Sequence, residues 1–148
     1  MKSICVVAMI IAIISCHEET KKEQSVTDIF SYYLKTAFGD SIPKEKHLFI
    51  LVPETGCKGC REDALHILHD EAIKTGRTGI TYIFSPKVHF NDLMTAPYKT
   101  LTDSSMLIDK INLPISNITF IKTAHGKVES INAIRSETTD SIRALLKK

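Results

Sequence analysis

Two cysteines separated by two residues, Cys57 and Cys60, lie between an apolar segment and an amphipathic one. The segment before them, residues 48–52, is an unbroken run of large apolar side chains, as expected of a β-strand that is buried on both faces. The segment after them, residues 61–75, has the apolar spacing of a helix with one buried face, and Gly76 is a suitable helix end. A buried strand that passes directly into a helix predicts an α/β fold, with both cysteines at the helix N-terminus.

This position of the cysteine pair indicates thiol–disulfide chemistry. A sulfur at a helix N-terminus faces unpaired backbone N–H groups and the positive end of the helix dipole, and both favour thiolate over thiol. We therefore expect Cys57 to attack a partner's disulfide and Cys60 to resolve the mixed disulfide that forms. The alternative is a binding module without enzymatic activity in which the pair is a structural disulfide. Such a bridge closes a very short loop and constrains the unfolded chain little.

A third interpretation is that the two thiolates carry a metal. His66 and His69 follow the cysteines and suggest a zinc site, but they lie one to two turns beyond Cys60 on the same predicted helix. Zinc needs all four donor atoms at about 2.0–2.3 Å from one point. We therefore expect no zinc site here. We also expect no cofactor, because electrons arrive in this chemistry as thiols.

The N-terminus has the features of a bacterial lipoprotein signal. A short cationic start is followed at residues 4–14 by an apolar run that is too short to span a bilayer as a helix. The run ends in Ile-Ile-Ser-Cys, which resembles a lipobox, with Cys16 as the lipidated residue. Residues 1–15 are then the signal peptide, and Cys5 is removed with it. An ordinary cleaved signal and an uncleaved anchor are the alternatives.

The remaining chain divides into a linker and one domain. Residues 16–24 form a charged linker after the lipidated cysteine, and residues 25–148 have a length typical of a single domain. The formal net charge is +2 and the basic residues are spread along the chain, so no nucleic-acid partner is indicated. We expect a monomer outside the cytoplasm, on the periplasmic face of a membrane or at the cell surface, where disulfides persist. Its partners are then the membrane, through the lipid, and protein thiols or disulfides.

Apolar periodicity predicts the order helix, strand, helix, strand, helix, hairpin, helix. The first helix has Ser25 as its N-cap and Gly39 just beyond its end. The predicted strands are residues 48–52, 80–84, 118–122 and 127–134. The next predicted helices are residues 61–75, a weak one at 89–96, and a short one carrying Met106, Leu107 and Ile111. A last helix is expected to be capped by Ser136 or Thr138. Its inward-facing residues are Ile142, Leu145 and Leu146.

This order, with Cys57 and Cys60 after the first central strand, resembles the thioredoxin fold. It is most similar to the extracytoplasmic thioredoxin-like (redoxin, TlpA-like) disulfide oxidoreductases, which are often tethered to membranes. Residues 101–128 carry this closer resemblance, with an acidic residue, a short helix, an aliphatic strand and a Gly-Lys hairpin at Gly126. The resemblance implies a central mixed sheet of about four strands flanked by helices, with a C-terminal β-hairpin followed by a helix.

The chain departs from this family at three places near the cysteines: at a cis-proline, at a tryptophan and at a buried carboxylate. A cis-proline opens the strand before the hairpin in the family and helps to dock substrate, and the corresponding residue here is Asn117, with Pro114 three residues earlier. Because a cis bond before asparagine costs about 3 kcal/mol, we expect trans geometry or a shifted loop there. The family also usually has tryptophan before the first cysteine, where this chain has Gly56.

Two charged residues are candidates for adjusting the pKa of Cys57. The buried carboxylate that transfers protons in thioredoxins would fall near Leu51, and Glu54 is the acidic residue nearby. Lys58 follows Cys57 directly and its charge would favour the thiolate. For both side chains the alternative is that they are simply solvated.

Overall fold

The computed structural model describes residues 25–76, 78–88, 98–115, 117–134, 142–144 and 146. Several predictions of the sequence lie outside these residues, namely the signal peptide with Cys5, the lipidated Cys16 and its linker, the weak helix at 89–96, the two caps Ser136 and Thr138, and Leu145. Among the described residues, no helix combines the length and the apolar character that crossing a bilayer requires.

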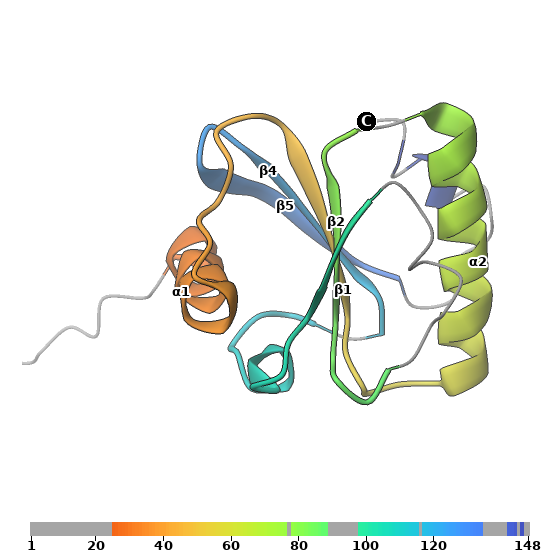
Figure 1. The fold of residues 1–148 in the computed structure, drawn as a ribbon, viewed down its shortest axis with the longest axis horizontal. Helices are drawn as coiled ribbons and strands as arrows, with labels where there is room; N and C mark the ends of the chain where they lie inside the picture. The colour runs from red at the N-terminus through yellow and green to blue at the C-terminus, as the bar shows by residue number, and fades with distance from the viewer. Residues whose placement is uncertain are drawn as a thin grey trace, which may run out of the picture.

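A five-stranded mixed sheet forms the centre of the described part of the chain (Figure 1). Its strands are β1 (His47–Val52), β2 (Ile80–Phe84), β3 (Lys99–Thr102), β4 (Thr119–Ala124) and β5 (Lys127–Ala133), in the order β3-β2-β1-β4-β5. The first three strands are parallel, whereas β4 runs antiparallel to β1 and β5 antiparallel to β4. A parallel β1–β2 pair beside an antiparallel hairpin is the arrangement of the thioredoxin fold, as predicted.

The strand β3 is the element that the sequence did not predict. It pairs with β2 at the edge of the sheet and adds a fifth strand to the four expected. Its four residues, Lys-Thr-Leu-Thr, are exposed or half-buried, so they show neither an apolar run nor a clear alternation of apolar and polar side chains. The short helix expected next is the 3-10 turn η2 (Leu107–Asp109), which begins after Met106.

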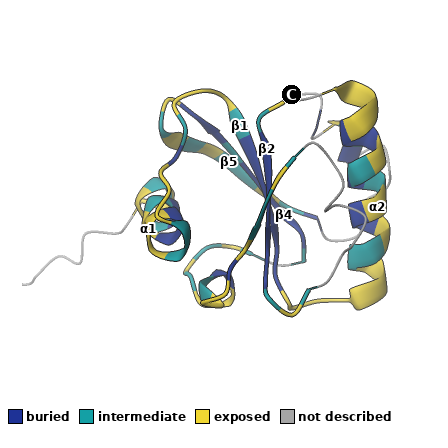
Figure 2. Ribbon diagram, in the orientation of Figure 1, coloured by how far each residue is buried: buried dark blue, intermediate teal, exposed yellow. Residues whose placement is uncertain are grey.

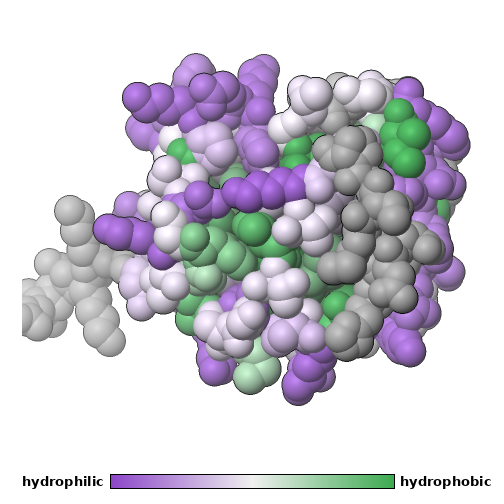
Figure 3. Space-filling model, in the orientation of Figure 1, coloured by the Kyte–Doolittle hydropathy of each residue, from purple (hydrophilic) through white to green (hydrophobic). Residues whose placement is uncertain are grey.

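Helical elements cover both faces of the sheet (Figure 1). The helix α1 (Val26–Phe38) and η2 lie on one face, and α2 (Lys58–Thr75) lies on the other. The predicted caps of α1 are confirmed, because Ser25 Oγ accepts a hydrogen bond from the Asp28 N–H (3.1 Å) and Gly39 is left-handed. The buried residues of both helices face the sheet (Figure 2), and mainly hydrophilic side chains lie along the outer side of α2 (Figure 3).

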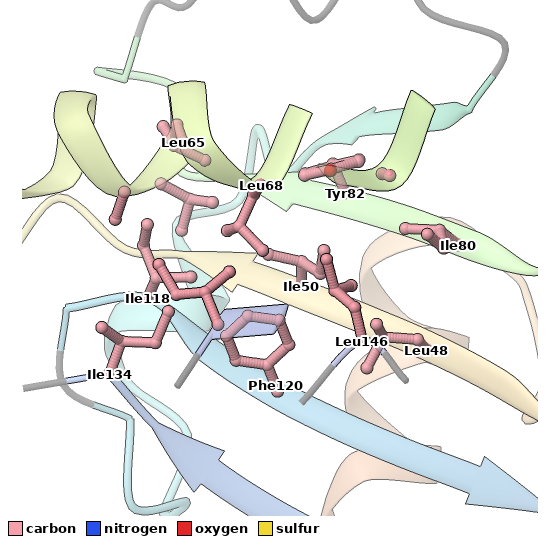
Figure 4. Close-up of a cluster of buried hydrophobic side chains, with 14 of the residues drawn as sticks. Leu48, Ile50, Leu65, Leu68, Ile80, Tyr82, Ile118, Phe120, Ile134 and Leu146 are labelled. Carbon is pink, nitrogen blue, oxygen red and sulfur yellow. The ribbon is translucent and has the colours of Figure 1, made fainter. Parts of the chain in front are cut away.

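The two faces of β1 contribute to two separate hydrophobic cores. Leu48, Ile50 and Val52 join the core under α2, whereas Phe49 and Leu51 join the core under α1. This explains the unbroken apolar run in the sequence, because successive side chains of a strand point to opposite faces. Figure 4 shows the first core, in which residues of the sheet meet Leu65 and Leu68 of α2 and Leu146 of the C-terminal segment. Ile142 belongs to the same core.

Candidate active site

Cys57 is the N-cap residue of α2, at the point where the chain leaves β1 and enters the helix. Its backbone is extended (φ −71°, ψ 117°), and its Sγ accepts a hydrogen bond from the Cys60 backbone N–H at 3.3 Å. Both cysteines are exposed and neither is in a disulfide. The strand-to-helix step therefore places one sulfur on the helix N-terminus and the other one turn along.

The two thiols have opposite acid–base behaviour. The pKa of Cys57 is lowered, mainly because the Cys60 thiol donates a hydrogen bond to it, and the N–H groups of Cys60 and Gly59 act in the same direction. The pKa of Cys60 is raised, mainly because its proton is held in this hydrogen bond. The negative charge of Asp63 opposes ionisation of both thiols. Cys57 is therefore the better thiolate, and Cys60 remains protonated beside it.

Alkylation should report this difference as a pH profile. Because only the thiolate reacts, the rate of Cys57 alkylation rises as the pH increases through its pKa, and a lowered pKa moves this rise below the value of about 8.5 for free cysteine. We expect the pH midpoint of Cys57 alkylation, measured with iodoacetamide and peptide mass spectrometry, to lie below about 8.5. In a Cys60→Ala variant the thiol donor is lost, so the midpoint should return toward that of free cysteine. A midpoint at or above the free value in the parent protein would contradict the assignment.

The structure places the two other candidates for pKa adjustment in salt bridges. The Glu54 carboxylate lies 2.8 Å from Lys87 Nζ, and this pairing raises the pKa of Lys87. Lys58 is 79% exposed, with its Nζ 3.8 Å from the Glu62 carboxylate. That either side chain adjusts the pKa of Cys57 remains a prediction.

Asn117 lies directly against the residue that precedes Cys57. A Cβ atom at Gly56 would overlap Asn117 Oδ1 and would lie 3.0 Å from Asn117 Cγ. Gly56 also has a φ of +107°, and Asn117 has a φ of +52°. The loop before β4 therefore contacts the loop before α2, and this contact requires glycine at position 56. The peptide bond before Asn117 joins it to residue 116, which lies outside the described residues, so its geometry remains a prediction.

Two residues that the sequence did not indicate hold the chain just before Cys57. Arg61 Nη1 donates to the carbonyl oxygens of Pro53 (3.2 Å) and Glu54 (2.9 Å). Asp109 Oδ1 accepts from the Glu54 backbone N–H at 3.3 Å. Arg61 could have been suspected, because it follows Cys60 directly on the predicted helix. Asp109 has no such signal, since it belongs to a turn far away in the sequence.

The two histidines considered for zinc lie on α2, where His66 is exposed and His69 is half-buried. In the ranges that the structure describes, no three His, Cys, Asp or Glu side chains are grouped so that they could hold a metal ion.

No family model matches the chain, and neither does any curated protein sequence. Similar solved structures include the exposed lipoprotein thioredoxin Etrx1 of Streptococcus pneumoniae, with 19% identity, coverage of 72% of this chain and 86% of that chain, and a TM-score of 0.47. A secreted disulfide oxidoreductase of Mycobacterium tuberculosis has 11% identity, coverage of 72% and 83%, and a TM-score of 0.48. The N-terminal domain of PilB from Neisseria meningitidis has 14% identity, coverage of 78% and 85%, and a TM-score of 0.44. Because these scores are below 0.5, the thioredoxin fold is assigned from the strand order and directions described above.

Proposed function

We propose that this protein exchanges disulfides with protein partners through Cys57 and Cys60. The observation that supports this most directly is the pair itself, exposed and free, with the sulfur of Cys57 accepting an N–H at the start of α2. The hydrogen bond from the Cys60 thiol to the Cys57 sulfur is the main reason why the pKa of Cys57 is lowered and that of Cys60 raised. A nucleophile and a protonated resolving thiol are the two groups that the reaction requires.

The proposed reaction has two steps. The Cys57 thiolate attacks one sulfur of a partner disulfide, which forms a mixed disulfide and releases the other partner sulfur as a thiolate. Cys60 then loses its proton and attacks Cys57 Sγ, which releases the second partner thiolate and leaves a Cys57–Cys60 disulfide. The partner thiolates take up protons, so the partner gains two electrons and this protein loses two. The reverse sequence oxidises a partner dithiol.

We further propose that the domain works outside the cytoplasm, attached to a bacterial membrane through a lipid on Cys16. The support is the N-terminal sequence, in which an apolar run ends in a lipobox-like segment at Cys16 and a charged linker follows. Each buried CH₂ of an acyl chain contributes about 0.8 kcal/mol of membrane affinity. An extracytoplasmic compartment would also allow the oxidised pair to persist.

A redox titration distinguishes exchange from a structural bond. We expect the full-length chain, equilibrated in glutathione buffers and trapped with an alkylating reagent, to show one reversible two-electron transition between about −120 and −270 mV, where exchange proteins fall. Resistance to reduction at potentials below about −300 mV would instead indicate the non-enzymatic binding protein with a fixed disulfide. Metal analysis of the reduced protein tests the metal-carrier alternative, for which bound metal at one equivalent would be the decisive result.

A further inference from the structure

We propose that Arg61 is a positioning residue, which keeps Cys57 at the N-cap of α2 by binding the chain that enters the helix. This proposal rests on the proposed function, because it concerns the same cysteine pair. It assigns to Arg61 a role in setting the reactivity of Cys57 without contact between Arg61 and the reacting sulfur atoms.

The contacts of Arg61 connect the first turn of α2 with the end of β1. Its Nη1 donates to two successive carbonyl groups, those of Pro53 (3.2 Å) and Glu54 (2.9 Å). Its own backbone N–H donates to the Cys57 carbonyl at 3.0 Å. Arg61 therefore bonds to the chain on both sides of residues 55–56. Guanidinium is well suited to this, because its N–H donors have a fixed planar geometry and it remains charged.

Asp109 of η2 binds the same stretch of chain from the face of the sheet opposite α2. Its Oδ1 accepts from the Glu54 N–H (3.3 Å), and its Oδ2 accepts from Ser85 Oγ (3.1 Å). Ser85 is fully buried, and its N–H donates to the Val52 carbonyl at 3.0 Å. We call Arg61, Asp109 and Ser85 the loop clamp, because together they join the ends of β1 and β2 to α2 and η2.

The loop clamp matters for chemistry because it fixes the chain on both sides of the two residues that lie between Glu54 and Cys57. Thr55 and Gly56 are exposed, and Gly56 has the conformational freedom of a glycine at a φ of +107°. When the loop clamp is closed, the contacts of Glu54 and of Arg61 fix the chain before and after Cys57, and so fix the position of Cys57. With the clamp open, Cys57 Sγ can leave the N–H groups of Gly59 and Cys60 and lose their stabilisation of the thiolate.

The charges near Cys57 make it possible to separate position from simple electrostatics. Lys58 and Arg61 are the cations within four residues of Cys57 in the sequence, and Glu62 and Asp63 are the nearest carboxylates along α2. Lys58 is paired with Glu62 and bonds to no part of the loop before Cys57 in the contacts described. If only positive charge near the helix N-terminus mattered, the two cations would have similar effects.

Four single variants of the full-length chain in detergent test the proposal, with circular dichroism and thermal unfolding as folding controls. They are Arg61→Ala, Arg61→Lys, Asp109→Ala and Lys58→Ala. The readouts are the rate of Cys57 alkylation by iodoacetamide at pH 7, its pH midpoint, and the redox potential of the pair. Asp109→Ala opens the loop clamp without a substitution in α2. It therefore tests whether the clamp sets the reactivity of Cys57 even if Arg61→Ala does not fold.

We expect Arg61→Ala and Asp109→Ala to slow alkylation at pH 7 about three- to tenfold and to raise the midpoint, as loss of a helix cap would. Because the reduced pair loses thiolate stabilisation, the potential should become more negative by about 14 to 30 mV, which is the same fold-change at 29.6 mV per tenfold. Arg61→Lys should resemble Arg61→Ala, because the shorter lysine lacks the planar donors. Lys58→Ala removes a nearby charge but no contact of the loop clamp, so it should slow alkylation less than Arg61→Ala does.

Three results would overturn the proposal: rates within twofold of the parent in folded Arg61→Ala or Asp109→Ala protein, full restoration in Arg61→Lys, or equal losses in Lys58→Ala and Arg61→Ala. Alkylation requires only Cys57 and no partner. The proposal for the loop clamp can therefore be wrong even if disulfide exchange is observed. The proposed exchange can likewise be wrong even if the loop clamp sets the pKa of Cys57.

Discussion

A Cys60→Ser variant should remain covalently joined to its partners, whereas Cys57→Ser should form no such adducts. In the proposed reaction Cys57 attacks first, and Cys60 is the group that releases the mixed disulfide. Removal of Cys60 leaves the attack possible but removes the intramolecular release. The adducts can be purified from cells under non-reducing conditions, separated from the protein by dithiothreitol, and identified by mass spectrometry.

The matched control for this experiment is the double variant Cys57→Ser/Cys60→Ser, which has no thiol in the described part of the site. Adducts on Cys60 in the Cys57→Ser protein, with few in Cys60→Ser, would reverse the roles of the two cysteines. If alkylation shows that Cys57 of the parent protein is reactive and neither single variant forms adducts, the result would argue against exchange with protein partners.

The parts of the fold that follow from apolar patterns could be predicted from the sequence. The run at residues 48–52 indicated a strand buried on both faces, and β1 does supply both cores. The direct passage from this run to a helix implied that Cys57 would lie at the helix N-terminus, and it is the N-cap of α2. Ser25 and Gly39 marked the ends of α1 because capping residues act locally, within one turn of the helix.

The parts that depend on contacts between distant segments could not be predicted. The strand β3 is an edge strand of four residues whose pairing with β2, and not its composition, makes it a strand. Asp109 reaches the Glu54 N–H from a 3-10 turn, and hydrogen bonds between a side chain and a distant backbone leave no periodic signal. The departures at Gly56 and Asn117 were both visible in the sequence, but the direct contact between these two residues was not.

The contact between Gly56 and Asn117 predicts a large loss of stability from a small substitution. In Gly56→Ala, the new Cβ overlaps Asn117 Oδ1, and alanine must adopt a φ of +107°, which side chains rarely tolerate. Backbone strain of this kind costs about 1–3 kcal/mol, and forced displacement of a packed neighbour adds about 1–3 kcal/mol. We therefore expect the free energy of unfolding in urea to fall by at least about 2 kcal/mol, a large fraction of the stability of a small domain.

Gly59→Ala is the matched control, because it makes the same change on the other side of Cys57. Gly59 lies in the first turn of α2, and a Cβ atom there would meet nothing within 4 Å. Alanine is favoured over glycine in helices by about 1 kcal/mol, so this variant should be neutral or more stable. The double variant Gly56→Ala/Asn117→Gly removes the overlap and keeps the strain, so it should recover only part of the loss. Equal stabilities for Gly56→Ala and Gly59→Ala would show that the two loops do not make the contact, and the geometry around Cys57 would then have to be reconsidered.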